Sequence, residues 1–326
     1  MKKLQEEFVV REDCQRLDIY LSERFCIFTR SQIKKRGVVA FKNSGGVFVG
    51  IKLSKPVFVG DEILIEFNEE VDLKNHVRPL KLPIDIIYED INVIVVNKPQ
   101  GILSHPCVTG MENTVVNFLL YHVSGLEDSF KEDKVRPGIV HRLDKDTSGV
   151  LICAKNWTTL NFLSTQFRER VVKKVYIAII KGAPKNLSGV IETFINRDRN
   201  DRKKFIVHNS RGKRALTEYK VWASIGNYSL VALRPKTGRT HQIRVHMKYL
   251  NHPILGDNVY GRIDRDFNDV SLMLHSFKLE ISIKEDFLKK FISEFPQRFV
   301  DFLSNFYTEE DLNMLIANFV EFLEEF

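Results

Sequence analysis

The sequence V-H-R-L-D-K-D-T-S-G-V at residues 140–150 joins a run of polar side chains directly to an apolar run at residues 149–154. A short, continuous apolar run is typical of a buried strand, so the polar residues before it are expected in a loop at the end of a rigid element. Loops held by a rigid scaffold often carry binding and catalytic residues. The stretch therefore predicts a functional site beside a buried strand.

This loop allows three interpretations. The first is an ordinary turn, because Asp and Ser side chains close to Gly hydrogen-bond to nearby backbone amides. The second is a calcium-binding loop, since the residues Asp144, Asp146, Ser148 and Gly149 occupy the first, third, fifth and sixth positions of the EF-hand pattern. That pattern needs a carboxylate at its twelfth position, where the chain has Lys155, and this argues against calcium.

The third interpretation is a resemblance to a known family. Residues 141–149, H-R-L-D-K-D-T-S-G, resemble the H-R-L-D-x-x-T-S-G signature of the RluA family of RNA pseudouridine synthases, with every fixed position filled. Further family motifs are matched by N-K-P-Q-G at 97–101, K-V-Y-I-A-I-I-K-G at 174–182 and T-G-R-T-H-Q-I-R-V-H at 237–246. The resemblance covers roughly residues 11–280 and implies an isomerase, an intramolecular transferase that converts uridine to pseudouridine in RNA.

The N-terminal part of the chain predicts a small separate module at residues 11–67. Apolar residues at helical spacing indicate two short helices near residues 16–25 and 30–35, and alternation with period two then indicates a small sheet. This arrangement resembles the αL RNA-binding fold of a small-subunit ribosomal protein. A plain packing module of helices and strands is the alternative.

The rest of the α+β fold follows from the resemblance. A polar linker containing prolines is expected at residues 68–83, followed at 84–280 by a catalytic domain with a mixed, largely antiparallel β-sheet and flanking helices. Beyond residue 280 the chain departs from the family pattern. Phenylalanines spaced by three and four in residues 287–326 predict an amphipathic helix, so residues 281–326 are interpreted as an acidic, Phe-rich helical tail that packs on the domain.

The resemblance implies three catalytic residues, Asp144, Arg244 and Tyr176. Asp144 would act on the ribose, either as the nucleophile at carbon 1 or as the base at carbon 2. Because burial raises the pKa of a carboxyl group, a guanidinium at bidentate distance, that of Arg244, would keep it ionised. Tyr176 would stack on the uracil, although alternation along its strand alone favours an ordinary buried tyrosine. The isomerisation needs no cofactor and no metal.

Basic residues are concentrated in one stretch of the chain. Residues 171–247 contain 17 lysines and arginines against 4 acidic residues, a net charge of +13, whereas residues 277–326 have a net charge of −6. Such a concentration favours a polyanionic partner, because neutralised phosphates release counterions. The candidate RNA contacts are His141, Arg142 and Thr147 in the signature loop, Arg239, the pair Lys203 and Lys204, and the residues Arg30, Lys34 and Lys35 of the second N-terminal helix.

Several of these residues have a simpler interpretation. A charge run such as the one containing Lys203 and Lys204 is usually a solvated hairpin tip, and His141, Arg142 and Thr147 can shape their loop without touching RNA. Charge reversal of the two lysines distinguishes these interpretations, because only phosphate contacts affect the salt dependence of RNA binding.

Composition narrows the compartment and the classes of site. No apolar run is long enough to cross a bilayer and the N-terminus lacks an apolar signal region, so a cytoplasmic location is expected. A monomer is expected as well, although these features do not determine the oligomeric state. The cysteines contain no C-x-x-C pair, which argues against a zinc knuckle or a disulfide framework. They are Cys14, Cys26, Cys107 and Cys153.

The partner implied by the resemblance is RNA, above all large-subunit ribosomal RNA as in RluC- and RluD-like members. The alternatives are a transfer-RNA pseudouridine synthase and a non-catalytic RNA-binding or ribosome-assembly protein. A metal-dependent nuclease is disfavoured, because the chain lacks a carboxylate cluster with metal-binding spacing. A purely RNA-binding protein has no need for a carboxylate such as Asp144 among phosphate-seeking cations.

Overall fold

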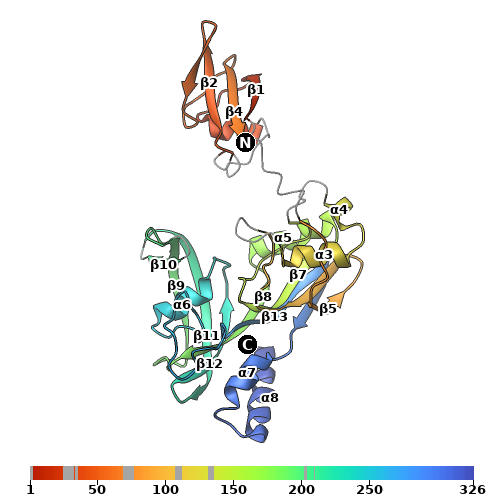
Figure 1. Ribbon diagram of the computed structural model, residues 1–326, viewed down its shortest axis with the longest axis vertical. Coiled ribbons are helices and arrows are strands. Elements are labelled where there is room, and N and C mark those ends of the chain that lie inside the picture. The colour runs from red at the N-terminus through yellow and green to blue at the C-terminus, as the bar shows by residue number, and fades with distance from the viewer. Residues whose placement is uncertain are drawn as a thin grey trace. The chain divides into compact units, whose positions relative to one another are not determined.

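The computed structural model of the chain describes residues 3–24, 33, 36–68, 77–106, 112–130, 136–201, 204–208 and 210–326. The chain divides into two compact units, Met1–His76 and Val77–Phe326, which are described here one at a time (Figure 1). The second unit begins inside the stretch 68–83 that is expected as a linker.

The first unit is built on a four-stranded antiparallel sheet with the strand order β1-β4-β2-β3. The short helix α1 (Leu17–Ile19) and the π-helical turn η1 (Tyr20–Arg24) pack their apolar residues on it. Because β1 pairs with β4 along its whole length, the sheet extends N-terminal to the expected module. Most of the second expected helix lies outside the described residues. The strands are β1 (Lys3–Val9), β2 (Val39–Ser44), β3 (Val47–Ile51) and β4 (Glu62–Asn68).

The second unit contains a ten-stranded sheet with the order β10-β9-β11-β12-β8-β13-β7-β6-β5, in which β14 also pairs with β13. All neighbouring strands are antiparallel except β13 and β7, which are parallel, so the expected mixed, largely antiparallel sheet is confirmed. The strands are β5 (Asp85–Glu89), β6 (Val93–Lys98), β7 (Ser148–Ala154), β8 (Lys173–Lys181), β9 (Ser188–Arg197), β10 (Phe205–His208), β11 (Lys213–Ile225), β12 (Tyr228–Pro235), β13 (Leu274–Lys284) and β14 (Phe287–Ile292).

Helices flank this sheet and divide its apolar residues into two main cores. Strands β6 and β7 are covered by α3 and α5, and strands β8 and β12 pack with α6, α7 and α8. Every residue of β7 is buried, as its unbroken apolar sequence predicts. The helices are α3 (Val115–His122), α4 (Leu126–Ser129), α5 (Trp157–Glu169), α6 (Gln242–Tyr249), α7 (Gln297–Leu303) and α8 (Glu309–Glu325).

The prediction of a helical tail from residue 281 is wrong for its first part. β13 continues to Lys284, and β14 then pairs with it antiparallel, with Phe291 opposite Leu279. A phenylalanine every four residues fits a helix equally well, but β7 pairs with β13 only at His275 and Ser276, and the same strand beyond them supplies backbone partners that favour a strand here. The remaining part is helical and packs on the domain, with Phe299, Phe302 and Phe319 almost fully buried.

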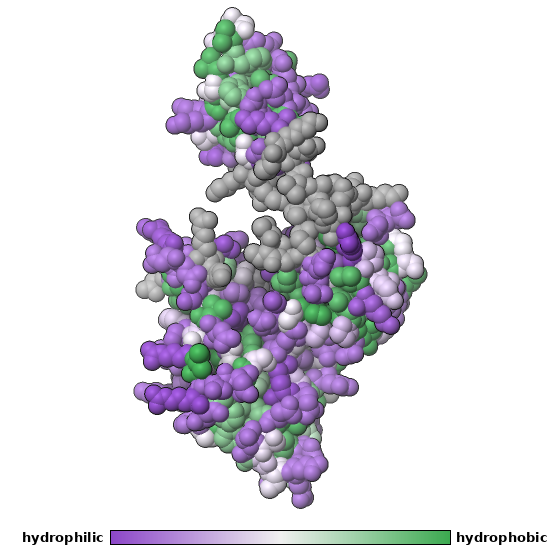
Figure 2. All heavy atoms as spheres, in the orientation of Figure 1, coloured by the Kyte–Doolittle hydropathy of each residue, from purple (hydrophilic) through white to green (hydrophobic). Residues whose placement is uncertain are grey.

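The outer surface of the second unit is mixed in character. On the face shown in Figure 2, hydrophilic residues cover most of this unit, and apolar residues form separate patches among them. No described helix is both long and apolar enough to span a membrane.

Two buried histidines, His246 and His275, and the partly buried His141 are expected to make the stability of the protein depend on pH. Burial is the largest cause that lowers the pKa of His141 and His275 to about 3 and that of His246 to about 4. In the unfolded chain each ring titrates near its ordinary pKa of about 6.5, so below that pH the unfolded state binds more protons. We therefore expect the free energy of unfolding to fall as the pH decreases from about 6.5 to about 4, each histidine contributing up to about 1.4 kcal/mol per pH unit.

Denaturant titrations between pH 7.5 and 4.5 measure this slope, and His246→Gln should make it shallower. In the folded protein, NMR should show that none of the three rings protonates above pH 5. A ring that titrates near pH 6.5 in the native state contradicts the prediction.

Candidate active site

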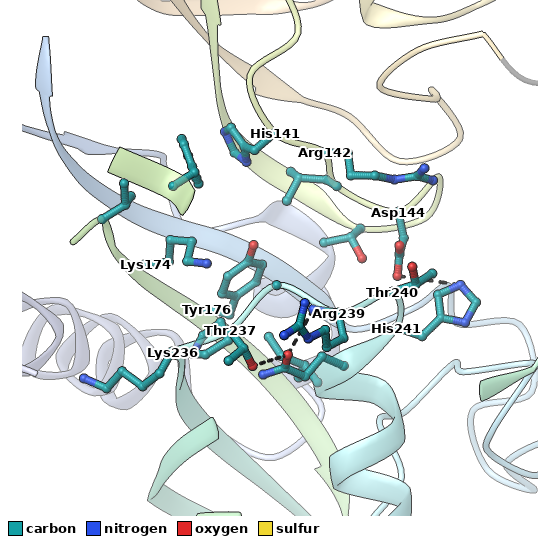
Figure 3. Close-up of a pocket in the computed structure, with 18 of the residues that line it drawn as sticks. His141, Arg142, Asp144, Lys174, Tyr176, Lys236, Thr237, Arg239, Thr240 and His241 are labelled. Carbon is teal, nitrogen blue, oxygen red and sulfur yellow. Dashed lines mark hydrogen bonds and ion pairs between the residues drawn. The ribbon is translucent and has the colours of Figure 1, made fainter. Parts of the chain in front are cut away.

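A cavity of about 500 Å³ lies in the second unit. It is bordered by the signature loop before β7, the start of β8, the end of α5 and the turn that leads from β12 into α6 (Figure 3). Strand β8 provides the neighbouring wall residues Lys174 and Tyr176, which alternation places on one face. Cationic side chains dominate the charged part of the lining: Arg142, Arg168, Arg170, Lys174, Lys236, Arg239 and Arg244.

Asp144 contributes its carboxylate to this cavity from the signature loop. The loop turns sharply here, since the Thr147 amide donates to the Asp144 carbonyl at 3.1 Å. The Asp144 side chain is 19% exposed, and its Oδ2 lies 3.7 Å from Nη1 of Arg244 and 3.8 Å from Nε2 of His241. Figure 3 shows the contact with His241 as a dashed line. The carboxylate is therefore accessible from the cavity and faces cationic or proton-donating groups.

Arg244 makes its bidentate pair with Asp257. Its Nε and Nη2 each donate to an Asp257 carboxylate oxygen at 2.8 Å, and the Asp257 side chain is fully buried. The expected bidentate pair with Asp144 is therefore wrong: two guanidinium nitrogens are taken by Asp257, and only Nη1 faces Asp144. The two expected partners are nevertheless close in space.

The two carboxylates near Arg244, those of Asp257 and Asp144, favour the positively charged form of its guanidinium. Burial opposes that charge, but the hydrogen bonds and charge of Asp257, and then the charge of Asp144, raise the pKa of the guanidinium above its ordinary value. Asp257 itself is held by the backbone amides of Val259 and Tyr260, which donate to its Oδ1 at 2.9 and 3.0 Å. Arg244 is thus a fixed cation beside Asp144.

Tyr260 and His241 complete the surroundings of Asp144. The Tyr260 hydroxyl accepts a hydrogen bond from the Phe205 amide at 2.9 Å and lies 2.8 Å from Nδ1 of His241. Nε2 is the ring atom that faces Asp144, and it carries the ring proton in the tautomer whose Nδ1 accepts from the Tyr260 hydroxyl. Burial is the largest influence on the pKa of His241 and lowers it, in keeping with a neutral ring.

Tyr176 is a partly buried, neutral phenol in the cavity wall. Burial raises its pKa to about 12, against the opposing effect of a hydrogen bond with Ser276. Lys174, two residues earlier on β8, lines the cavity as well, and burial lowers its pKa to about 8. Both side chains lie to the left of Asp144 in the view of Figure 3.

The other signature residues hold the loop. His141 stacks on Phe167 with ring centroids 4.5 Å apart, and its Nε2 accepts from the Ile152 amide at 3.1 Å. Thr147 is 2% exposed, and its Oγ1 has no hydrogen-bond partner among the described residues. Arg142 is exposed at the cavity and can still meet a ligand.

The remaining RNA-binding candidates divide by position. Arg239 donates from Nε to the Arg214 carbonyl at 3.0 Å, so it braces the turn before α6 as well as lining the cavity. Lys204 lies at the tip between β9 and β10, where it pairs with Asp201 at 3.5 Å and is 43% exposed. Lys203, Arg30, Lys34 and Lys35 lie outside the described residues.

Several site residues were not predicted from the sequence. Arg168, Arg170, Lys174 and Lys236 line the cavity, and Asp257 is the main partner of Arg244. For Lys174 a signal existed, because it stands two positions before Tyr176 on a strand. Within the described ranges, no group of three or more His, Cys, Asp or Glu side chains could hold a metal ion.

Three comparisons describe what this chain resembles. The family model for RNA pseudouridylate synthases matches residues 92–249. The chain is 62% identical over 326 residues, all of both proteins, to a protein of Borreliella burgdorferi named ribosomal large subunit pseudouridine synthase D. A Zymomonas mobilis protein of the same name is 44% identical over 188 residues, 57% of this chain and 59% of that protein.

A solved structure shares the fold. The human protein RNA Pseudouridylate Synthase Domain Containing 1 aligns with a TM-score of 0.54 and 27% identity, over 70% of this chain and 86% of that one.

Proposed function

Since the chain belongs to the RNA pseudouridylate synthase family, we propose that it isomerises uridines in large-subunit ribosomal RNA, with Asp144 as the reactive carboxylate and no cofactor. The observation that carries the proposal is the position of Asp144, partly exposed in the cavity and 3.7 Å from a guanidinium that Asp257 fixes.

The reaction requires an ionised carboxylate at the ribose. Uridine and pseudouridine are isomers: the N1 to carbon 1 bond breaks, a carbon 5 to carbon 1 bond forms, carbon 5 loses its proton and N1 gains one. As nucleophile at carbon 1 or as base at carbon 2, Asp144 must be negatively charged. The Nη1 of Arg244 and the Nε2 proton of His241 both stabilise that charge without blocking the side of the carboxylate that faces the cavity.

Tyr176 is assigned to the base. Its neutral ring offers a flat apolar surface in the cavity wall, suited to stacking on uracil while the base detaches and turns. A pKa of about 12 leaves little phenolate at neutral pH, which favours stacking over direct removal of the carbon 5 proton.

Access to the base requires flipping the nucleotide out of its stack, at a cost of a few kcal/mol. Contacts with the flanking phosphates offset this cost, and the cations that line the cavity supply them. Arg142 and Lys236 are exposed there, and Arg168 and Arg170 stand at the end of α5. We assign these four side chains to the phosphates on either side of the target uridine.

The assignment to ribosomal RNA rests on the names of the similar proteins and on the N-terminal unit, which we propose to be an αL-type RNA-binding domain. Binding to ribosomal RNA would place the enzyme in the cytoplasm, where we expect a monomer. A transfer-RNA pseudouridine synthase is the second candidate for the substrate. Mapping of pseudouridine in ribosomal and transfer RNA, from cells with and without the gene, distinguishes them. Loss of sites in neither RNA would refute the proposed activity.

Charge reversal at the tip between β9 and β10 is expected to weaken RNA binding without slowing the chemical step. Lys203→Glu combined with Lys204→Glu should lower affinity for all RNA sequences alike and reduce the log–log salt slope by about 1.4, at about 0.7 for each lost phosphate contact to single-stranded RNA. Single-turnover rates at saturating enzyme should not change, because Lys204 does not line the cavity.

The matched control reverses two cations elsewhere on the same unit. Lys284→Glu with Lys290→Glu introduces the same charge change on exposed residues at β13 and β14. Filter binding at four salt concentrations compares the two double variants. Equal salt slopes in both would show that the tip is only a solvated hairpin.

A further inference from the structure

We propose that Arg298, in helix α7 of the C-terminal segment, is a positioning residue that holds the loop carrying Asp144 in its reactive conformation. Its Nη2 donates to Ser148 Oγ at 2.7 Å and to the Leu274 carbonyl at 3.0 Å. Ser148 closes the signature loop, and Leu274 is the first residue of β13. One guanidinium therefore ties the C-terminal segment to the loop and to the central strand. The inference rests on the proposed function of Asp144.

The contacts around Arg298 form a chain with one consistent direction. Arg298 can only donate, so Ser148 Oγ accepts from it and donates its own proton to His275 Nδ1 at 2.8 Å. His275 then carries its proton on Nε2 and donates to Ser293 Oγ at 2.6 Å, and Ser293 donates to the Phe277 carbonyl at 3.2 Å. Burial, and then the charge of Arg298, lowers the pKa of His275 to about 3, as a neutral ring with this tautomer requires.

The loop transmits this restraint over a short distance to Asp144. The amide of Thr147 holds the carbonyl of Asp144, and Ser148 is the next residue. Gly149 follows at φ +114°, with its backbone so close to Ser276 that an added Cβ would lie 2.1 Å from the Ser276 carbonyl oxygen. The backbone on both sides of Ser148 is therefore restrained, and the hydrogen bond from Arg298 to the Ser148 hydroxyl completes the restraint on the turn that aims Asp144.

A partly buried guanidinium such as that of Arg298 lowers the stability of the fold if its only role is to fill space. Burial lowers the pKa of its guanidinium to about 10, so the group stays charged, yet no carboxylate forms an ion pair with it in the described part of the chain. Its Nε is buried and has no hydrogen-bond partner among these residues. An apolar side chain would avoid both costs. The contacts that an apolar residue could not replace are the two donated hydrogen bonds and the cation–π contact with Phe299, whose ring centroid lies 5.0 Å from the guanidinium carbon.

Arg298, together with His275 and Ser293 of its hydrogen-bonded chain, lies outside the residues that the family model matches. That match ends at residue 249, whereas Arg298, His275 and Ser293 all follow it. The C-terminal segment is anchored independently of Arg298, because Phe299 and Phe302 of the same helix lie in the apolar core. The segment can therefore hold Arg298 rigidly against the loop.

Kinetic measurements on variants of Arg298 and Ser148 test whether Arg298 positions the loop or only stabilises the fold. Arg298→Met is expected to lower kcat about tenfold, within the range known for small misplacements of a reacting group, and to leave the KM for RNA unchanged because Arg298 does not line the cavity. Arg298→Lys should recover part of the loss by donating to one of the two acceptors. Ser148→Ala should lower kcat to the same extent, and the double variant should be no slower than either single one, since both remove the same contact.

The matched control is Phe302→Leu in the same helix. Phe302 is 3% exposed and packs on Tyr228 and Phe267, away from the signature loop, so this variant should lower Tm without changing kcat below the melting range. A wild-type kcat in Arg298→Met, or an equal kcat loss in Phe302→Leu, would overturn the inference. Asp144→Asn distinguishes the two proposals, because its activity depends on the proposed function and not on Arg298.

Discussion

Asp144→Asn is expected to abolish pseudouridine formation, with a rate loss of at least about 10⁴-fold, the scale seen when the reactive group of an enzyme is removed. The amide can neither attack carbon 1 nor accept a proton from carbon 2. Large-subunit ribosomal RNA from cells lacking the gene provides the unmodified substrate. Pseudouridine formed in that RNA is measured by mass spectrometry.

The same variant should fold and bind RNA normally. Among the described residues, the Asp144 carboxylate has a long ion pair with Arg244 at 3.7 Å and a long contact with His241 at 3.8 Å, so its loss removes little stability. Asp146→Asn is the matched control, since Asp146 is exposed in the same loop and does not line the cavity. It should keep full activity. Turnover by Asp144→Asn at the wild-type rate would show that another group acts on the ribose.

Arg244→Met is expected to cause the second largest loss, because it affects both chemistry and folding. Without the guanidinium, Asp144 loses its nearest cation, and kcat should fall about 10²- to 10³-fold, the typical cost of removing a preorganised charge-stabilising group. Asp257, whose side chain is fully buried, is left without its bidentate partner. Breaking a buried pair in this way costs about 3 to 5 kcal/mol of unfolding free energy.

A second substitution separates these two effects. Asp257→Asn in the Arg244→Met background removes the unpaired charge, and its amide oxygen can still accept from the Val259 and Tyr260 amides. The double variant should regain most of the unfolding free energy that Arg244→Met loses, whereas its kcat should stay as low as that of Arg244→Met. Urea denaturation and single-turnover kinetics measure the two quantities. Recovery of activity together with stability would mean that Arg244 is only structural.

Sequence motifs predicted correctly that Asp144 and Arg244 come close together, because each lies in a motif with all its fixed positions filled. The motifs could not show which carboxylate takes the bidentate contact. Asp257 forms the bidentate contact because its side chain is fully buried, where an unpaired charge would be costly. Two backbone amides also donate to its carboxylate and hold it in place beside the guanidinium. The pairing is decided by burial, which a sequence motif does not encode.

The C-terminal part was the least predictable. Phenylalanines at spacings of three and four are compatible with a helix, and only pairing with β13 makes residues 287–292 a strand. Arg298 carries no local signal at all, since its partners Ser148 and Leu274 are distant in sequence. Lys174 could have been identified, because strand alternation places it on the same face as Tyr176.

The position of β13 in the sheet has a consequence for synthesis of the protein. β13 is hydrogen-bonded to β8 on one side and to β7 on the other, so it joins two half-sheets that are made earlier. Until β13 (Leu274–Lys284) has been synthesised, a nascent chain has unpaired edges at β8 and β7 and no strand that connects them. We therefore expect a chain truncated before β13 to lack the connection between β8 and β7 and to aggregate more readily through these unpaired edges.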